Sequence, residues 1–157
     1  MVGTDRIEFP ALCIASNGFV YGVADQATLD SCSTTAFKAG YFDGLRVFDA
    51  EGKAGVVRGT TYAGAMSSPV GWRLWRIFRT SFIRVGLDLE WLPELVGLHQ
   101  LQQVVCASMD QLPDPWEDSE GGVASAKRAV REAQSIPALV QLFLGEVFTA
   151  KESWRWR

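Results

Sequence analysis

The stretch from Trp72 to Trp91 constrains the fold of this chain most strongly, because its hydrophobic period changes partway along it. Up to Arg79, the apolar and basic residues fall on opposite sides of a helix when placed at about 100° per residue. From Ile83 onwards, apolar side chains occupy every second position, which is the period of a strand. The pattern predicts a short amphipathic helix that leads into a half-buried strand with charged residues on its outer face.

Size and composition favour one globular domain. The chain has 157 residues, 48% of them hydrophobic, and a domain of about this length buries roughly 70% of the surface of its unfolded chain. The formal net charge of -3 gives no general reason to bind nucleic acid or acidic membranes. Any basic function must therefore be local.

The cysteines and the start of the chain indicate a reducing compartment. Cys13, Cys32 and Cys106 are odd in number, widely spaced and surrounded by apolar or small residues, so we expect reduced core residues. The first residues do not combine a basic region with an apolar run, and no apolar run approaches the ~18 residues of a membrane span. The sequence predicts a soluble cytoplasmic protein.

Two hairpins are expected in the first half of the chain. Asn17-Gly18 separates the apolar runs 11–16 and 19–23, and this dipeptide is typical of tight hairpin turns. The turn 49–52 separates the run 45–48 from a second run that continues through Val57 toward Tyr62. Four strands follow from these patterns, and the strand from Ile83 is the fifth.

A helix is predicted between the hairpins. Asp25 can cap it, and it extends to about Ala39, where Gly40 can supply the left-handed C-terminal position. Its expected buried face has helical spacing and consists of Leu29, Cys32 and Ala36.

The sequence after Trp91 is helical in character. Pro93 suits a first turn, and apolar residues then recur at helical spacing at Leu95, Leu98, Leu101, Val105 and Met109. A short basic helix is expected over 124–134. Ser135 can cap a further helix with an apolar face of Ile136, Val140, Phe143 and Val147.

This order of elements predicts the fold class. Strands joined by hairpins and followed by helices indicate an α+β fold, with an antiparallel sheet of about five strands packed against C-terminal helices. We expect one domain over residues 1–157. Residues 151–157 form a tail that either packs its indoles on the body or is disordered.

Catalytic and metal chemistry have little support in the sequence. His99 is the only histidine, and Cys106 lies seven residues from it on the same predicted helix, too far for direct contact. The chain lacks the paired cysteines or histidines of a closed zinc site, and its glycines lack the spacing of a phosphate-binding loop. We predict no cofactor and no metal.

One carboxylate pair offers an enzymatic alternative. Asp88 and Glu90 project from one strand face about 7 Å apart, beside Arg84, a separation that suits a small hydrolase. A solvated face with cross-strand ion pairs is the ordinary alternative.

The arginine-rich segment is a candidate partner-binding surface. Arginine and tryptophan are enriched at protein interfaces, and together they also suit single-stranded nucleic acid, where the indole stacks on a base. The alternative without a ligand is a solvated helix face. The residues of this surface are Trp72, Arg73, Arg76, Arg79 and Arg84.

An acidic loop is the second candidate surface. Such a loop would steer a basic partner by electrostatic complementarity, although a solvated connector between helices explains the same composition. Its residues are Asp114, Trp116, Glu117, Asp118 and Glu120.

The tract KAGYFDGLRVFDAEGKAGVVRG, from Lys38 to Gly59, with the arginine-rich segment and strand beyond it, resembles small bacterial proteins of the polymorphic-toxin immunity type. The resemblance implies a cytoplasmic protein that binds and blocks a toxin, and it assigns no binding residue. We therefore expect a non-enzymatic protein-binding domain with a protein partner, and expect neither nucleic acid nor membrane as its main ligand. The hydrolase and the single-strand nucleic-acid binder are the alternatives.

Overall fold

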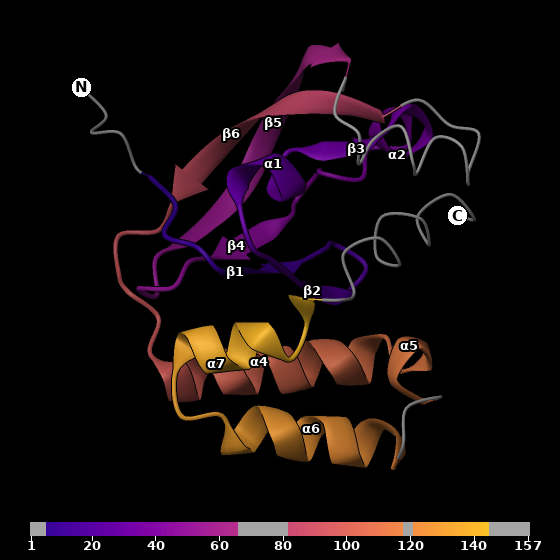
Figure 1. The fold of residues 1–157 in the computed structure, drawn as a ribbon. Helices are drawn as coiled ribbons and strands as arrows, with labels where there is room; N and C mark the ends of the chain where they lie inside the picture. Colours follow the sequence, from indigo (N-terminus) through magenta and orange to yellow (C-terminus); the bar gives the residue numbers. More distant parts are fainter. Residues whose placement is uncertain (1–5, 66–81, 118–120, 145–157) are drawn as a thin grey trace.

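A curled antiparallel sheet and a layer of helices from the C-terminal part make up the α+β structure (Figure 1). The computed structural model describes residues 6–65, 82–117 and 121–144. Within them the strands are β1 (Ala11–Ile14), β2 (Val20–Val23), β3 (Ser31–Ser33), β4 (Arg46–Phe48), β5 (Ala54–Ala65) and β6 (Phe82–Trp91). The helices are α1 (Gln26–Leu29), α2 (Thr34–Lys38), α4 (Leu98–Gln111), α5 (Asp114–Glu117), α6 (Gly122–Glu132) and α7 (Ile136–Gln141).

The six strands have the order β2-β1-β4-β5-β6-β3, and every neighbouring pair is antiparallel. Both predicted hairpins are confirmed: β1 pairs with β2, and β4 pairs with β5. In the first turn, Gly18 has φ 94° and the Phe19 N–H donates to Asn17 Oδ1 at 3.0 Å. In the second, buried Asp49 accepts from the N–H groups of Glu51 and Lys53, both at 2.9 Å.

The predicted helix from Asp25 to Ala39 is wrong in its middle. Asp25 does cap a helix, accepting from the Thr28 N–H at 2.7 Å, but α1 ends at Leu29 and β3 follows. Residues 31–33 are serine and cysteine, which are weak helix formers, and they pair with residues 82–84 of β6 instead. This strand raises the number from the expected five to six. The chain becomes helical again in α2, and Gly40 ends it with φ 77° as predicted.

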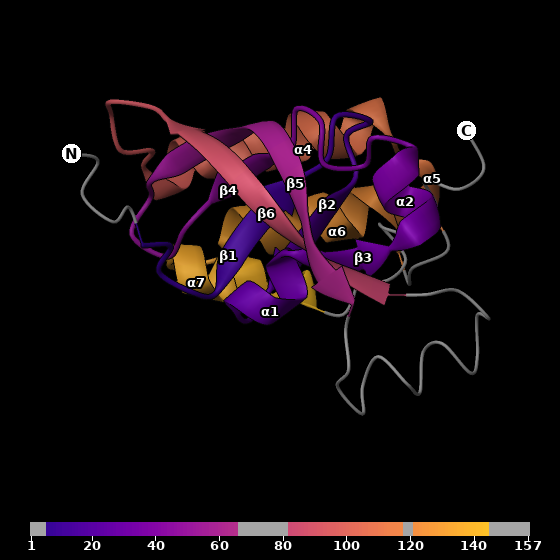
Figure 2. The same ribbon diagram turned by 90° about the horizontal axis from the view of Figure 1, so that it is seen from above.

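The alternating strand is confirmed as β6. Ile83 and Val85 are buried, Leu87 and Leu89 pack partly buried against the core, and the charged residues between them are exposed. Seen from above, β5 and β6 form a long ribbon, and β3 lies beside only one end of β6 (Figure 2).

Two hydrophobic clusters lie on opposite sides of β1. Inside the curl of the sheet, Cys13 joins the cluster of Tyr21 and Tyr41, whereas Leu12 and Ile14 face the helices. β1 is therefore buried on both faces, which explains why Ala11 to Ile14 are all apolar.

The helical layer packs beneath β1 and β2 (Figure 1). Leu101, Val105 and Met109 of α4 are fully buried, as their spacing predicts. The helix begins at Leu98 rather than near Pro93, so the prediction is wrong for Leu95, which is 68% exposed in the preceding loop. The predicted basic helix over 124–134 is confirmed as α6. The predicted helix that ends at Arg79 lies outside the described residues, and so does Val147 of the last predicted helix.

In α7, Ser135 Oγ accepts from the Ala138 N–H at 3.1 Å, so the predicted cap is confirmed. None of the helices in the described ranges has the length and apolar character needed to cross a bilayer.

Candidate functional site

Most of the predicted arginine surface lies outside the described residues. This applies to Trp72, Arg73, Arg76 and Arg79, and equally to the tail 151–157. Arg84 is described, and it is exposed on β6 where this strand pairs with β3. The arginine surface and the nucleic-acid alternative therefore stay predictions.

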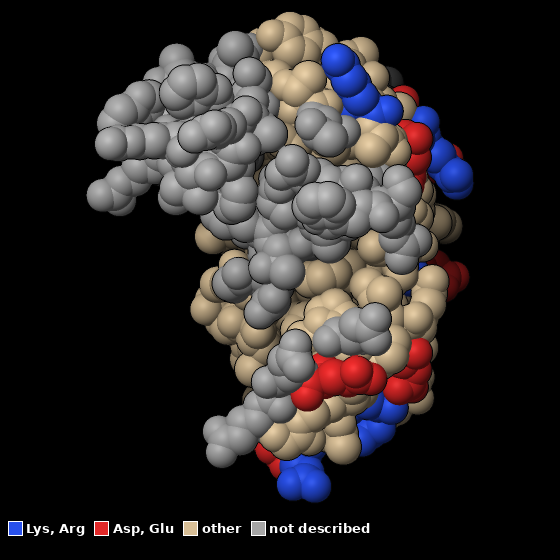
Figure 3. Space-filling view, turned by 90° about the vertical axis from the view of Figure 1, so that its right-hand side faces the viewer, with Lys and Arg blue, Asp and Glu red and all other residues tan. Residues whose placement is uncertain are grey.

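The predicted acidic loop includes the short helix α5. Asp118 and Glu120 lie outside the described residues, Asp114 begins α5, and Glu117 is exposed. Acidic and basic side chains lie close together on the face of the molecule at the α5 end of the helical layer (Figure 3).

Trp116 belongs to the core and does not contribute an exposed contact. Its side chain is only 6% exposed, and its ring lies 5.9 Å from that of Phe19 and 5.4 Å from that of Phe143. The indole thus anchors α5 against β2 and the end of α7. This corrects its assignment to a partner-binding surface, because packing against aromatic side chains removes it from solvent.

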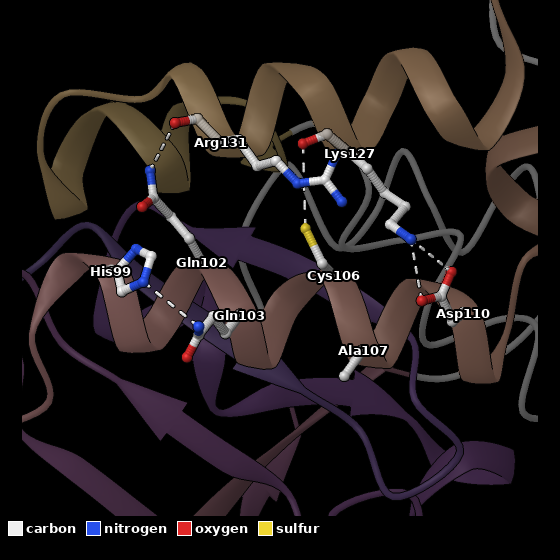
Figure 4. A pocket seen from close by; sticks show the side chains of 8 residues that line it. All are labelled: His99, Gln102, Gln103, Cys106, Ala107, Asp110, Lys127 and Arg131. Carbon is white, nitrogen blue, oxygen red and sulfur yellow. Dashed lines mark hydrogen bonds and ion pairs between the residues drawn. The ribbon is translucent and has the colours of Figure 1, made fainter.

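A polar groove of about 520 Å³ lies between α4 and α6 (Figure 4). At one end Lys127 Nζ contacts both carboxylate oxygens of Asp110, at 2.9 and 3.0 Å. At the other end the side chains of His99 and Gln103 lie 3.3 Å apart. The histidine and cysteine of α4 are thus held by different partners, as expected from their separation along the helix.

Cys106 lines this groove as a protonated thiol. Burial raises its pKa, and nearby Asp110 acts in the same direction, while Arg131 and Lys127 oppose the shift. Its Sγ lies 4.0 Å from the carbonyl oxygen of Lys127. Since the thiolate is the nucleophilic form of cysteine, this environment does not activate Cys106.

Gln102 fastens the two helices of the groove to each other. Its buried Nε2 donates to the carbonyl oxygens of Val130, Arg131 and Ala133, at 2.9, 3.2 and 3.0 Å. These carbonyls lie at the C-terminal end of α6, where backbone acceptors lack helical partners. Gln102 is therefore a structural residue. The spacing of the apolar residues in this helix did not reveal its role, because that role depends on contacts with another helix.

The carboxylates of the hydrolase alternative lie on the outer face of β6. Asp88 and Glu90 are both exposed, and the Arg58 side chain of β5 contacts Glu90 at 2.7 Å. The side chains of Arg58 and Glu90 are 59% and 60% exposed, respectively. This arrangement matches the solvated face with a cross-strand ion pair, and it does not show the converging pocket that the hydrolase requires.

The edge of β6 that faces away from β5 is unpaired over part of its length, as far as the described residues go. Val85 N–H donates to the Asp30 carbonyl oxygen at 2.8 Å, so the backbone groups of Val85 point toward β3. Backbone direction alternates along an antiparallel strand, so Leu87, Leu89 and Trp91 point the same way. The pairing with β3 covers only residues 82–84. In the ranges that the structure describes, no backbone group pairs with this edge beyond Val85.

The unpaired edge has two chemically different sides. Toward the core, Leu87, Leu89 and Trp91 are partly buried, and the Trp91 ring lies close over Gly55. Toward solvent, Asp88 and Glu90 present carboxylates, and none of the described cations lies within salt-bridge distance of Asp88. The alternating sequence predicted both faces, but the free edge depends on where β3 ends and was not predicted.

Comparison of the chain with protein-family models, with curated proteins and with solved structures found no match.

Proposed function

We propose that this protein is a non-enzymatic protein-binding domain and that it neutralises a toxin by binding it. The observation that carries the proposal is the edge of β6 from Leu87 to Trp91, which has no backbone partner among the described residues and has carboxylates along one side. Open strand edges are templates for pairing with another chain, and folded proteins usually shorten or cover them. A long edge that is left open within the described part of the chain is therefore a candidate binding surface.

The charge of this surface also supports binding. Carboxylates on an exposed strand attract a partner with basic residues, speed its association and disfavour acidic competitors. The resemblance to immunity-type proteins suggests the class of partner. A toxin that acts on nucleic acid would carry the basic residues that complement such a surface, because phosphate binding requires them.

The test is titration calorimetry of the purified protein with the purified protein encoded by the neighbouring gene. We expect one saturable binding event, weaker at high salt, and survival of cells that express both proteins. The double variant Asp88→Lys/Glu90→Lys should bind at least about tenfold more weakly, a change of about 1.4 kcal/mol in binding free energy.

The matched control is Glu132→Lys, which reverses an exposed carboxylate at the end of α6. It should bind like the unaltered protein. Absence of binding together with absence of protection in cells would contradict the proposed function.

A further inference from the structure

We infer that the open edge of β6 receives an extended segment of the partner in which apolar and basic residues alternate. This inference rests on the proposed protein-binding function and specifies how the partner is recognised. The partner segment would add a strand to the sheet beside residues 87–91, beyond the point where β3 stops.

The backbone supplies the docking groups. Leu87, Leu89 and Trp91 direct N–H and C=O groups away from β5, and the last described pairing on that side is Val85 with Asp30. Five residues of an extended chain span about 17 Å, which is the length of an ordinary strand. A partner strand of that length would satisfy these groups and bind by strand addition.

The side chains determine which partner sequence fits. In an added strand, side chains alternate between the two faces just as they do in β6. Those on the core side would meet Leu87, Leu89 and Trp91, which favour apolar neighbours. Those on the solvent side would meet Asp88 and Glu90, which favour lysine or arginine.

The same charges disfavour a second copy of this chain as the occupant. If two β6 edges paired antiparallel about Leu89, Asp88 of each copy would lie opposite Glu90 of the other. Like charges directly across a sheet are destabilising. The carboxylates thus select a basic partner and oppose homodimerisation through this edge.

The experiment measures binding of a short alternating valine and lysine peptide, capped at both ends, to the full-length protein by fluorescence anisotropy. We expect saturable binding. A peptide of alternating valine and glutamate, and a valine and lysine peptide with the same composition but no alternation, should each bind at least about tenfold more weakly. Equal binding of all three would overturn the inference.

Methylation of peptide nitrogens tests the backbone pairing without altering the protein. In an added strand, every second peptide N–H points toward β6 and the others point away from it. Methylation of the first set would remove the donors to β6, whereas methyl groups on the second set would face solvent. We expect a loss of at least about tenfold for the first set and less than about threefold for the second. Equal losses for the two sets would mean that the peptide does not bind as an added strand.

Charge reversal tests the side-chain selection. Asp88→Lys/Glu90→Lys should exchange the preference, so that the valine and glutamate peptide binds more tightly than the lysine peptide. Glu132→Lys should leave the original preference unchanged. Retention of the lysine preference in the double variant would overturn the inference.

The two proposals fail in different ways. If the neighbouring toxin binds but the alternating peptide does not, and β6 remains accessible in that complex, the proposed function stands and strand addition is wrong. If neither binds, both fail. Self-association of the protein that protects residues 87–91 would identify a second copy as the occupant and also overturn the inference.

Discussion

The outer edge of β2 and the open part of β6 are two margins of one sheet, and they are treated differently. At β2, the Gly22 N–H donates to the Phe143 carbonyl oxygen at 2.8 Å, and α7 packs against the strand. At β6, the pairing with β3 ends at Arg84, and the groups beyond Val85 have no described backbone partner. One edge is covered by the helical layer, and the other has no backbone partner among the described residues beyond Val85.

The difference follows from the local sequences. Gly22 has no side chain, and a Cβ at this position would lie 2.8 Å from the Val140 carbonyl oxygen, so only glycine permits the close approach of α7. On β6, the solvent-facing positions carry Asp88 and Glu90, and charged residues keep an exposed edge from aggregating. The closed edge contributes to stability, and the open edge is suited to recognition.

The largest expected effect concerns the tyrosines behind the closed edge. Tyr21 on β2 and Tyr41 are fully buried, and burial raises the pKa of each well above its ordinary value. The unfolded chain therefore loses these protons first, and stability falls as the pH rises above about 10, by about 1.4 kcal/mol per pH unit for each tyrosine.

Urea unfolding between pH 8 and pH 11 measures this loss. Above about pH 10, Tyr21→Phe should reduce the slope by the contribution of one tyrosine, about 1.4 kcal/mol per pH unit, because Tyr41 remains. If the free energy of unfolding fell equally steeply with pH in the variant and in the unaltered protein, the assigned role of Tyr21 would be contradicted.

The next largest effect is expected when the closed edge is opened. Gly22→Ala places a methyl group against the Val140 carbonyl oxygen, and we expect it to cost about 2 kcal/mol of unfolding free energy. Gly59→Ala on β5 is the matched control, because its nearest neighbour atom would lie 3.9 Å away. Urea unfolding should show little change for the control. An equal loss in both variants would mean that replacing any glycine in a strand is destabilising, and that the close approach of α7 to Gly22 is not the cause.

A smaller effect is expected at the residue that holds the helical layer together. Gln102→Leu removes the donor to three carbonyl oxygens near the end of α6, just before the loop that leads to α7. We expect a loss of about 1 to 2 kcal/mol. Gln103→Leu, an exposed neighbour, should change stability by less than about 0.5 kcal/mol. The reverse order in thermal or urea unfolding would contradict the structural role of Gln102.

The smallest effect is expected on the outer face of the open edge. Glu90→Gln breaks the ion pair with Arg58, but both side chains are well exposed, so screening should limit the cost to about 0.5 kcal/mol. Urea unfolding measures this cost, and Asp88→Asn is the companion variant because it removes a carboxylate charge from the same face without breaking an ion pair among the described residues. A loss above about 1 kcal/mol would make this face part of the stability of the fold rather than a surface available for binding.

Local patterns predicted much of the fold. Asn17-Gly18, Asp25, Gly40 and Ser135 all occupy the turn or cap positions that their chemistry indicates. The prediction fails at Ser31 to Ser33, because pairing with a segment about fifty residues away outweighs the local helical pattern. It also fails at Leu95, because the apolar residues at helical spacing begin before the true start of α4 at Leu98.

The candidate site was less predictable for the same reason. The alternation of β6 identified its apolar and acidic faces, but the free edge depends on the length of a strand that local pattern assigned to a helix. Trp116 shows the converse error. It lies among carboxylates in the sequence, and yet its neighbours in space are Phe19 and Phe143.

Amide hydrogen exchange, measured residue by residue with NMR, tests the open edge of β6 most directly. In the free protein, the N–H groups of Leu87, Leu89 and Trp91 should exchange quickly, whereas that of Gly22 should be protected. Saturation with the alternating valine and lysine peptide should slow the three β6 amides and leave Gly22 unchanged. Protection of the β6 amides in the free protein, or no change when the bound peptide saturates the protein, would contradict the account.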